Sequence, residues 1–598
     1  MRDELPFTID GQNLRHTRRR QVFIFAMSCL ALAGLVGRLF YWQIIDRSFL
    51  AARASSEHLG QFIITARRGT IYDIHGNILA LNLSGDAVYL HLANLRQAAA
   101  RQPQLLPELA SQLAGACGLS TDLVLHELHS SQPGGYLLDA DGNRVHLTDA
   151  QESRFDELAG GADYSGLVDF VPDTWRTYPE GSLAAQVLGY VDLDGVGHYG
   201  IEQQYNRLLA GHNGLMTTEM DENGQPLPFG AKEYIPPVDG ANLTLTLDAN
   251  IQRMAEQGLQ ATVKKYGARD GTVIIVNVHT GAIIAMASTP TFNPNNYGLA
   301  AAQYGYQIFQ NPAISTVYDP GSTMKAVTMS TGLNLGVIKP DTSFYDPGYF
   351  DVPGTSIQIH NWADAAYGQE TMVGVLRHSA NVGAAWVAVT RIGMDRFDQS
   401  LQRFGYGQLT GIDLPDESPG LLSPEHDLLT LADNAFGESI GVTPLQQVMA
   451  YAALANGGVL MQPYIVQQID LNGKISVHHP VVMRRVVSAK AARELGQMLV
   501  EAAINGEAQE TQVPGYEVAT KTGTSTPDPS NPNLTIASVA GFAPATDPQF
   551  AMLVKIDYPT WGVFGGTVAA PLWHDLAERL FFYYHIPPDV PSQLINQP

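Results

Sequence analysis

The sequence predicts an α+β protein in which a single N-terminal transmembrane helix precedes two domains of mixed helices and strands. Three observations predict this class. One apolar segment, residues 21–45, is long enough to span a bilayer. Runs typical of strands occur both before and after a long region of helical pattern. The length of 598 residues allows about two to four domains, each with its own core.

Composition and charge exclude several classes of function. The formal net charge is −23, and no basic cluster outside the N-terminus indicates nucleic-acid binding. Cys29 lies in the apolar segment, so Cys117 has no partner for a disulfide framework. His126 and His129 lack further ligands nearby, and Asp139–Asn143 resembles only the start of a calcium loop, which favours a hairpin turn. We expect no metal and no cofactor.

The N-terminus has the pattern of an uncleaved membrane anchor. Residues 1–20 are polar and end in an arginine cluster, whereas residues 21–45 are apolar apart from Arg38 and Gln43. A helix of this length covers ~37 Å, more than the ~30 Å hydrocarbon core. The basic flank predicts a cytoplasmic tail at 1–20, with everything after residue 45 outside the membrane. The alternative is a buried core helix.

Residues 46–235 are predicted to form the next domain. The expected elements are strands at 62–65 and 70–72 and helices near 103–116 and 149–159. Pro236–Gly240 has the composition of a linker.

Residues 236–590 are predicted to form a second domain, with 591–598 as a tail. Asp248 is placed to cap a helix whose apolar face includes Ile251 and Leu259. The region 325–510 is largely helical in pattern. Further expected elements are strands at 243–247, 272–278, 282–287, 521–524, 538–542 and 550–556 and a helix at 569–585. This order predicts a sheet at the centre with helices around it.

The chemistry centres on Asp319–Lys325, in which Ser322 and Lys325 are separated by three positions at the start of an expected helix. That spacing puts both side chains on one face, as a serine nucleophile and a neighbouring amine base require. Free N–H groups at a helix N-terminus favour negative charge near Ser322. By itself this pattern is more often a surface serine and lysine.

Two later segments make a catalytic interpretation stronger. Ser379-Ala380-Asn381 and Lys521-Thr522-Gly523-Thr524 follow in the order typical of serine acyl-transferases of the penicillin-binding type, with Ala380 in place of the more usual Asp. The competing motif Gly437–Gly441 matches a hydrolase nucleophile elbow, but the polar residues before it do not predict the buried strand that such an elbow needs.

These residues predict a division of chemical roles. Lys325, with its pKa lowered by burial and by Lys521, is expected to be the general base for Ser322. Ser379 is expected to relay protons, and Asn381 to hydrogen-bond the substrate amide. The predicted substrate-binding residues are Thr522, Gly523 and Thr524. Lys521, Thr522 and Thr524 are expected to bind a substrate carboxylate. The backbone N–H groups of Ser322 and Thr524 are expected to form an oxyanion hole.

Nearly the whole chain resembles the class B penicillin-binding proteins, which are peptidoglycan D,D-transpeptidases. The catalytic segments above carry this resemblance, together with Thr443-Pro444-Leu445-Gln446. Earlier segments resemble the non-catalytic pedestal of the family: Arg68–Asp73, Arg176–Gly181, Leu188–Val191 and Gly200–Glu202. The resemblance implies an elongated pedestal of the dimerisation type at 46–235 and a penicillin-recognising domain with a central antiparallel sheet at 236–590.

The resemblance also implies a reaction and a set of partners. Ser322 would attack a stem peptide of lipid-linked nascent glycan and pass the acyl group to a neighbouring stem, and β-lactams would acylate Ser322. Asn381 and Phe404-Gly405-Tyr406-Gly407 are similar to the cell-division subgroup. Members of that subgroup work with a polytopic glycosyltransferase of the shape, elongation, division and sporulation family and with other division proteins at the bacterial plasma membrane.

Four alternatives remain open. They are an elongation-type transpeptidase, a D,D-carboxypeptidase, a β-lactamase of the same fold and a non-catalytic division scaffold.

Overall fold

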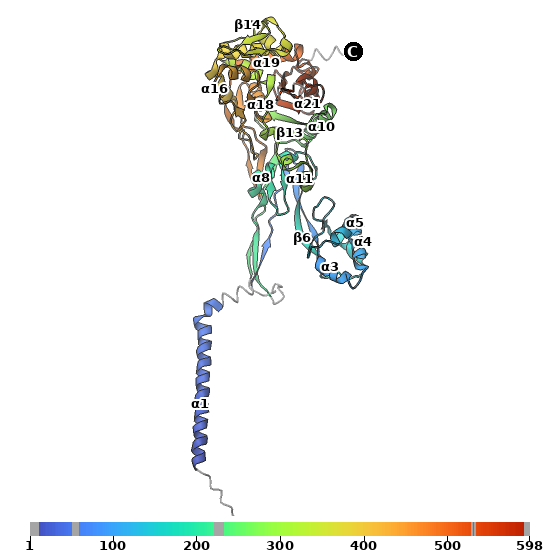
Figure 1. Cartoon of the computed structure of the whole chain (residues 1–598), viewed down its shortest axis with the longest axis vertical. Coiled ribbons are helices and arrows are strands. Elements are labelled where there is room, and N and C mark those ends of the chain that lie inside the picture. The colour runs from blue at the N-terminus through green and yellow to red at the C-terminus, as the bar shows by residue number, and fades with distance from the viewer. Residues whose placement is uncertain (1–10, 51–58, 221–231, 528–529, 532–533, 591–598) are drawn as a thin grey trace, which may run out of the picture. The chain divides into compact units, whose positions relative to one another are not determined.

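The computed structural model of the chain is shown in Figure 1 and describes residues 11–50, 59–220, 232–527, 530–531 and 534–590. The predicted tail at 591–598 and the first half of the tail at 1–20 lie outside the described residues. The chain divides into two compact units, which consist of residues 1–66 with 212–238 and of residues 67–211 with 239–598. Most of the segment predicted as a pedestal therefore lies in the same unit as the catalytic motifs.

The first unit contains the apolar helix and a small sheet. Helix α1 (Gly11–Phe40) continues into a π-helical turn, η1 (Tyr41–Ile45), and its apolar side chains are exposed. The helix begins earlier than the predicted span because the preceding Leu, Gln and Arg residues are good helix formers. Strand β9 (Gly214–Glu219) pairs antiparallel with both β1 (Leu59–Ile64) and β10 (Lys232–Ile235).

Within the second unit, a long antiparallel ribbon supports a helical subdomain. The ribbon pairs β3 (Ile78–Leu90) with β6 (Val168–Thr177). Between these strands the chain forms α3 (Leu92–Ala99), α4 (Leu105–Cys117), α5 (Thr121–Leu128) and α6 (Asp149–Ala159), which Figure 1 shows gathered at one end of the ribbon. The helices predicted near 103–116 and 149–159 are confirmed. Asp139–Asn143 forms a tight turn between β4 (Gly135–Tyr136) and β5 (His146–Leu147), as predicted.

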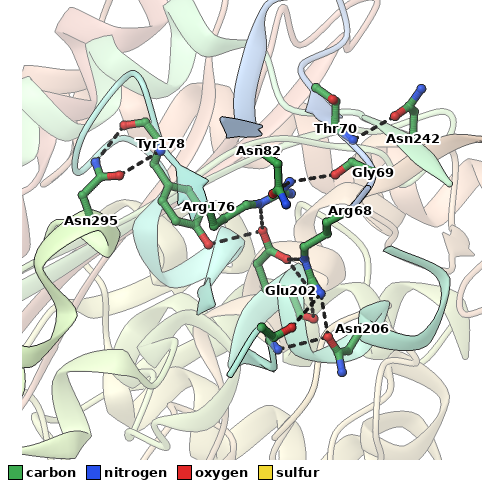
Figure 2. Close-up of polar contacts among 12 residues, drawn as sticks. Arg68, Gly69, Thr70, Asn82, Arg176, Tyr178, Glu202, Asn206, Asn242 and Asn295 are labelled. Carbon is green, nitrogen blue, oxygen red and sulfur yellow. Dashed lines mark hydrogen bonds and ion pairs between the residues drawn. The ribbon is translucent and has the colours of Figure 1, made fainter. Parts of the chain in front are cut away.

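A buried carboxylate joins the ribbon to the rest of the unit (Figure 2). Glu202, on α8 (Gly200–Gln204), accepts hydrogen bonds from Arg68 Nε at 2.8 Å and from Arg176 Nε at 2.7 Å. Burial alone would raise the Glu202 pKa, but Arg176 and Arg68 outweigh it and the pKa is lowered. Tyr178 donates its hydroxyl to Glu202 at 3.2 Å, and its backbone N–H and C=O pair with the Asn295 side chain. One carboxylate thus connects segments about 130 residues apart in the sequence.

The catalytic part of the second unit is built on a five-stranded antiparallel sheet, as predicted. Its order is β13-β12-β26-β25-β24. The strands are β12 (Asp270–Asn277), β13 (Ile283–Thr289), β24 (Ala519–Ser525), β25 (Ile536–Ala543) and β26 (Phe550–Asp557). The predicted strands at 272–278, 282–287, 521–524, 538–542 and 550–556 are confirmed.

Helices cover both faces of this sheet, which is why its strands are apolar at nearly every position. Val273 and Ile275 pack on one side with α10 (Ala249–Tyr266) and α21 (Ala570–Tyr583). Ile274 and Val276 pack on the other side with α18 (Pro444–Ala455) and α19 (Ala489–Asn505), and Figure 1 shows the two helix layers. Asp248 caps α10 as predicted, because its carboxylate accepts from the N–H groups of Asn250 and Ile251.

The Glu202 cluster yields the first prediction. Glu202→Gln should lower the free energy of unfolding by about 3–5 kcal/mol, because two buried guanidinium groups then lose their counter-charge. We would measure the thermal unfolding midpoint of the full-length protein in detergent. Glu180→Gln is the matched control, since its ion pair with Arg253 is exposed on both sides and should be worth at most ~1 kcal/mol. Equal midpoints for the two variants would contradict the prediction.

Candidate active site

The nucleophile segment is a 3₁₀ turn rather than the start of an α-helix. Turn η4 (Gly321–Met324) precedes α13 (Lys325–Asn334), so the expectation of an α-helix from Ser322 onward is wrong by one turn. Gly321 has φ +54°, and a Cβ there would lie 2.8 Å from the carbonyl oxygen of Thr524. The backbone of Thr524 on β24 therefore leaves no room for a side chain at Gly321 in this turn. A 3₁₀ geometry also aligns residues three apart, which brings Ser322 directly over Lys325.

Lys325 is the centre of the site. Its Nζ lies 2.7 Å from each of three oxygens, Ser322 Oγ, the Ser379 carbonyl oxygen and Asn381 Oδ1. The side chain has no solvent exposure. Burial lowers the pKa of Lys325 well below its ordinary value, and the positive charge of Lys521 lowers it further, whereas Glu507 and Glu438 act in the opposite direction.

The neutral form of Lys325, which burial and Lys521 favour, can also be matched to the three oxygens around Nζ. A neutral amine has two N–H donors and one lone pair. The Ser379 carbonyl and Asn381 Oδ1 can only accept, so they take the two N–H groups. The lone pair then faces the hydroxyl proton of Ser322, which is the arrangement that general-base catalysis needs.

Ser379 and Asn381 are presented by the turn between α14 (Met372–Arg377) and α15 (Asn381–Trp386). Ser379 has φ +53°, a strained value for a residue with a side chain. Its Oγ lies 3.4 Å from Lys325 Nζ and 2.9 Å from Lys521 Nζ, and so bridges the two amines. Asn381 Nδ2 donates to the His360 carbonyl at 3.2 Å, so both ends of this amide have partners within the protein. Its predicted bond to the substrate amide stays a prediction.

Strand β24 supplies the opposite wall of the site from the end of the central sheet. Lys521 is almost fully buried, and burial lowers its pKa, whereas Glu507 raises it. Gly523 is needed because a Cβ there would lie 2.7 Å from the Pro320 carbonyl oxygen. Thr524 packs with its backbone against Gly321, which places the two predicted oxyanion-hole residues on adjoining backbone segments.

Buried polar contacts with α18 hold the turn Gly321–Met324 in place. Thr323 Oγ1 donates to the Pro320 carbonyl at 2.7 Å and accepts from Gln447 Nε2 at 3.0 Å. Tyr451 donates its hydroxyl to the Thr323 carbonyl at 2.8 Å. Both Gln447 and Tyr451 lie on α18, whose first turn is closed by a capping box at Thr443.

A cavity of about 540 Å³ opens above these groups. Ser322, Ser379, Asn381, Thr522 and Thr524 line it, whereas Lys325 and Lys521 lie beneath its surface. Other lining residues lie outside the three catalytic motifs and were not predicted, among them Trp362, Phe436, Glu438, Glu507, Glu510 and Phe564. Trp362 and Phe564 meet edge to face with centroids 5.4 Å apart.

The Gly437–Gly441 segment is not a nucleophile elbow. It follows helix α17 (Leu428–Asn434) rather than a strand, and Ser439 Oγ donates to Asp433 at 3.2 Å. Gly437 instead packs against the turn that carries Ser322, because a Cβ there would lie 2.1 Å from the Gly321 carbonyl oxygen. Within the described ranges, no cluster of three or more His, Cys, Asp or Glu residues is placed to hold a metal ion.

Comparison with known protein families gives two matches that together span most of the chain. Residues 271–578 match the penicillin binding protein transpeptidase domain. Residues 63–245 match the penicillin-binding protein dimerisation domain. The first match contains every residue of the site described above.

Individual proteins are similar over nearly their full length. Stage V sporulation protein D of Bacillus subtilis is 30% identical, over 93% of this chain and 84% of that protein. Peptidoglycan D,D-transpeptidase FtsI of Escherichia coli is 28% identical, over 94% of this chain and 92% of that protein. The crystal structure of penicillin binding protein 3 from Mycobacterium tuberculosis complexed with aztreonam has a TM-score of 0.66 and 26% identity, and covers 88% of this chain and 98% of that one.

The lowered pKa of Lys325 yields the second prediction. Acylation should speed up as pH rises through this pKa, because the neutral amine is the base. Lys521→Ala removes a positive charge that lowers the Lys325 pKa, so the ascending limb of the rate profile should move to higher pH. The measurement is the second-order rate of acylation by a fluorescent penicillin across the pH range.

The exposed Lys490, on α19, provides the control for this profile, and Lys490→Ala should leave the limb in place. If the ascending limb of the rate profile of Lys521→Ala is unchanged or moves to lower pH, Lys521 does not lower the Lys325 pKa.

Proposed function

Because the chain belongs to the penicillin-binding proteins and is a peptidoglycan D,D-transpeptidase, we propose that it cross-links septal cell wall through an acyl-enzyme at Ser322. The observation that carries the proposal is the position of Lys325 Nζ, which lies 2.7 Å from Ser322 Oγ. The other two short contacts of Nζ are with the Ser379 carbonyl oxygen and Asn381 Oδ1, which can only accept hydrogen bonds.

Acylation begins with transfer of the Ser322 hydroxyl proton to Lys325. Ser322 Oγ forms a bond to the penultimate carbonyl carbon of a stem peptide ending in D-Ala-D-Ala. The C–N bond to the terminal D-Ala then breaks, and the proton moves from Lys325 through the Ser379 hydroxyl to the leaving amine. The contacts of Ser379 Oγ with Lys325 at 3.4 Å and Lys521 at 2.9 Å support this relay.

Transfer reverses the same steps with a different amine. An amine of a neighbouring stem attacks the acyl carbon and gives its proton to Lys325, and Ser322 Oγ leaves and takes the proton back. Backbone N–H groups near Ser322 and Thr524 stabilise the oxyanion in both halves, a contribution of ~2.7–4 kcal/mol for a typical donor. Lys521, Thr522 and Thr524 bind the terminal carboxylate of the donor, and Gly523 lets β24 approach closely. A β-lactam acylates Ser322 in the same way.

Asn381 and the Phe404–Gly407 segment, which are similar to the cell-division subgroup, support a septal role. An elongation role is the alternative within the same family.

The N-terminal helix supports membrane attachment. Residues Thr17–Ile45 form one helix long and apolar enough to cross a membrane, which together with the relatives indicates a single-pass membrane protein. We propose that the N-terminus is cytoplasmic, because Arg18, Arg19 and Arg20 lie at the N-terminal end of this helix, directly before its apolar residues 21–45. The proposed partner is a polytopic glycosyltransferase of the shape, elongation, division and sporulation family, bound through α1 and the pedestal.

The third prediction concerns the nucleophile. The full-length protein should form a stable covalent adduct with a fluorescent penicillin, and Ser322→Ala should form none because the attacking oxygen is absent. The measurement is in-gel fluorescence, with Ser439→Ala as the control serine that keeps full labelling. Label lost within minutes would indicate a β-lactamase. Absence of label on a folded wild-type protein would favour a scaffold, as would normal division of cells that carry only Ser322→Ala.

A further inference from the structure

A carboxylate of the chain itself occupies the anion-binding wall of the cavity. Glu507 Oε2 accepts a hydrogen bond from Thr522 Oγ1 at 3.2 Å and lies 3.9 Å from Lys521 Nζ. In the described part of the chain, Glu507 is the only acidic partner of Lys521. These are the two groups proposed above to bind the terminal carboxylate of the donor peptide. Glu507 therefore makes the contacts proposed for an anionic substrate.

The backbone around Glu507 is held in place on three sides. A Cβ on Gly506 would lie 2.3 Å from the Arg377 carbonyl oxygen, so the chain passes close against the end of α14. A Cβ on Gly566 would lie 2.6 Å from the Glu507 carbonyl oxygen, which marks equally close packing against α20 (Gly565–Val568). Thr511, four residues on, shares a hydrogen bond of 2.7 Å with Thr520 on β24.

This fixed backbone carries a movable carboxylate. The side chain of Glu507 is 54% exposed to the cavity, whereas Lys521 beside it is 2% exposed. The carboxylate can therefore swing into solvent without disturbing the fold, while Lys521 and Thr522 stay where they are. Such an arrangement suits an exchange of one carboxylate for another at a fixed pair of donors.

We propose that Glu507 is a specificity-determining residue that competes with the carboxylate of the substrate for Thr522 and Lys521. An anionic ligand, either a donor peptide or a penicillin, displaces Glu507 when it binds. The inference rests on the proposed roles of Lys521 and Thr522. It differs from a role in binding the cationic acceptor amine, which would affect transfer and leave acylation unchanged.

The test is the second-order rate of acylation of the full-length protein by benzylpenicillin, a monoanion. Glu507→Gln keeps the shape of the side chain and removes its charge, so acylation should become about tenfold faster. Glu507→Ala removes the competitor altogether and should show an increase at least as large. Rates are compared on the pH plateau, where Lys325 is neutral in every variant, so that the contribution of Glu507 to the Lys325 pKa does not enter.

Glu510→Gln is the matched control. Glu510 lines the same cavity and carries the same charge, but Glu507 is the acid that contacts Thr522 and Lys521. Its substitution should change the rate less than twofold. Glu507 variants that acylate at the wild-type rate, or a Glu510→Gln increase equal to that of Glu507→Gln, would overturn the inference. Failure of the wild type to acylate would instead overturn the proposed function of Ser322.

Discussion

The site depends on one lysine amine that is kept out of water. Lys325 Nζ contacts oxygens from three places, its own turn at Ser322, the Ser379 backbone and the Asn381 side chain. Hydration normally stabilises the charged form of lysine, so burial shifts the balance toward the free amine, and the positive charge of Lys521 shifts it further. The helices and the sheet edge that enclose Lys325 therefore lower the pKa of a residue that is ordinarily protonated at neutral pH, as its proposed role as the base requires.

Enclosure of this kind requires close contact between backbones, and glycines provide it. Gly321 approaches β24, Gly437 approaches Gly321, and Gly523 approaches Pro320, each at a distance that a side chain would prevent. Gly321, Gly437 and Gly523 follow one another at intervals of 116 and 86 residues, so three distant segments meet around Ser322. The strained φ of Ser379 belongs to the same arrangement, since it directs both its carbonyl and its hydroxyl toward buried amines.

Local pattern was enough to predict most elements and to single out the residues that the structure brings together at the cavity. The strands of the central sheet follow from apolar runs, and the pairing of Ser322 with Lys325 follows from their spacing at the start of a predicted helix. The 3₁₀ geometry of the turn at Ser322 could not be predicted, because Thr524 and Gly437 impose it from distant parts of the chain. Trp362, Phe564 and Glu507 were missed for the same reason: each is a single residue without a motif, brought to the cavity only by tertiary packing.

The charges around the cavity suit a reaction in which two different ions arrive in turn. In the proposed reaction the donor peptide brings a carboxylate, and that carboxylate departs with the released D-Ala. Glu507 can then return to Thr522 and Lys521, which blocks the released D-Ala from binding again. The charged residues that line the cavity surface are then acidic, namely Glu438, Glu507 and Glu510, and an incoming amine is attracted to them as a cation. On this proposal, a carboxylate that the chain itself supplies weakens binding of the donor and, by the same competition, weakens rebinding of the released D-Ala.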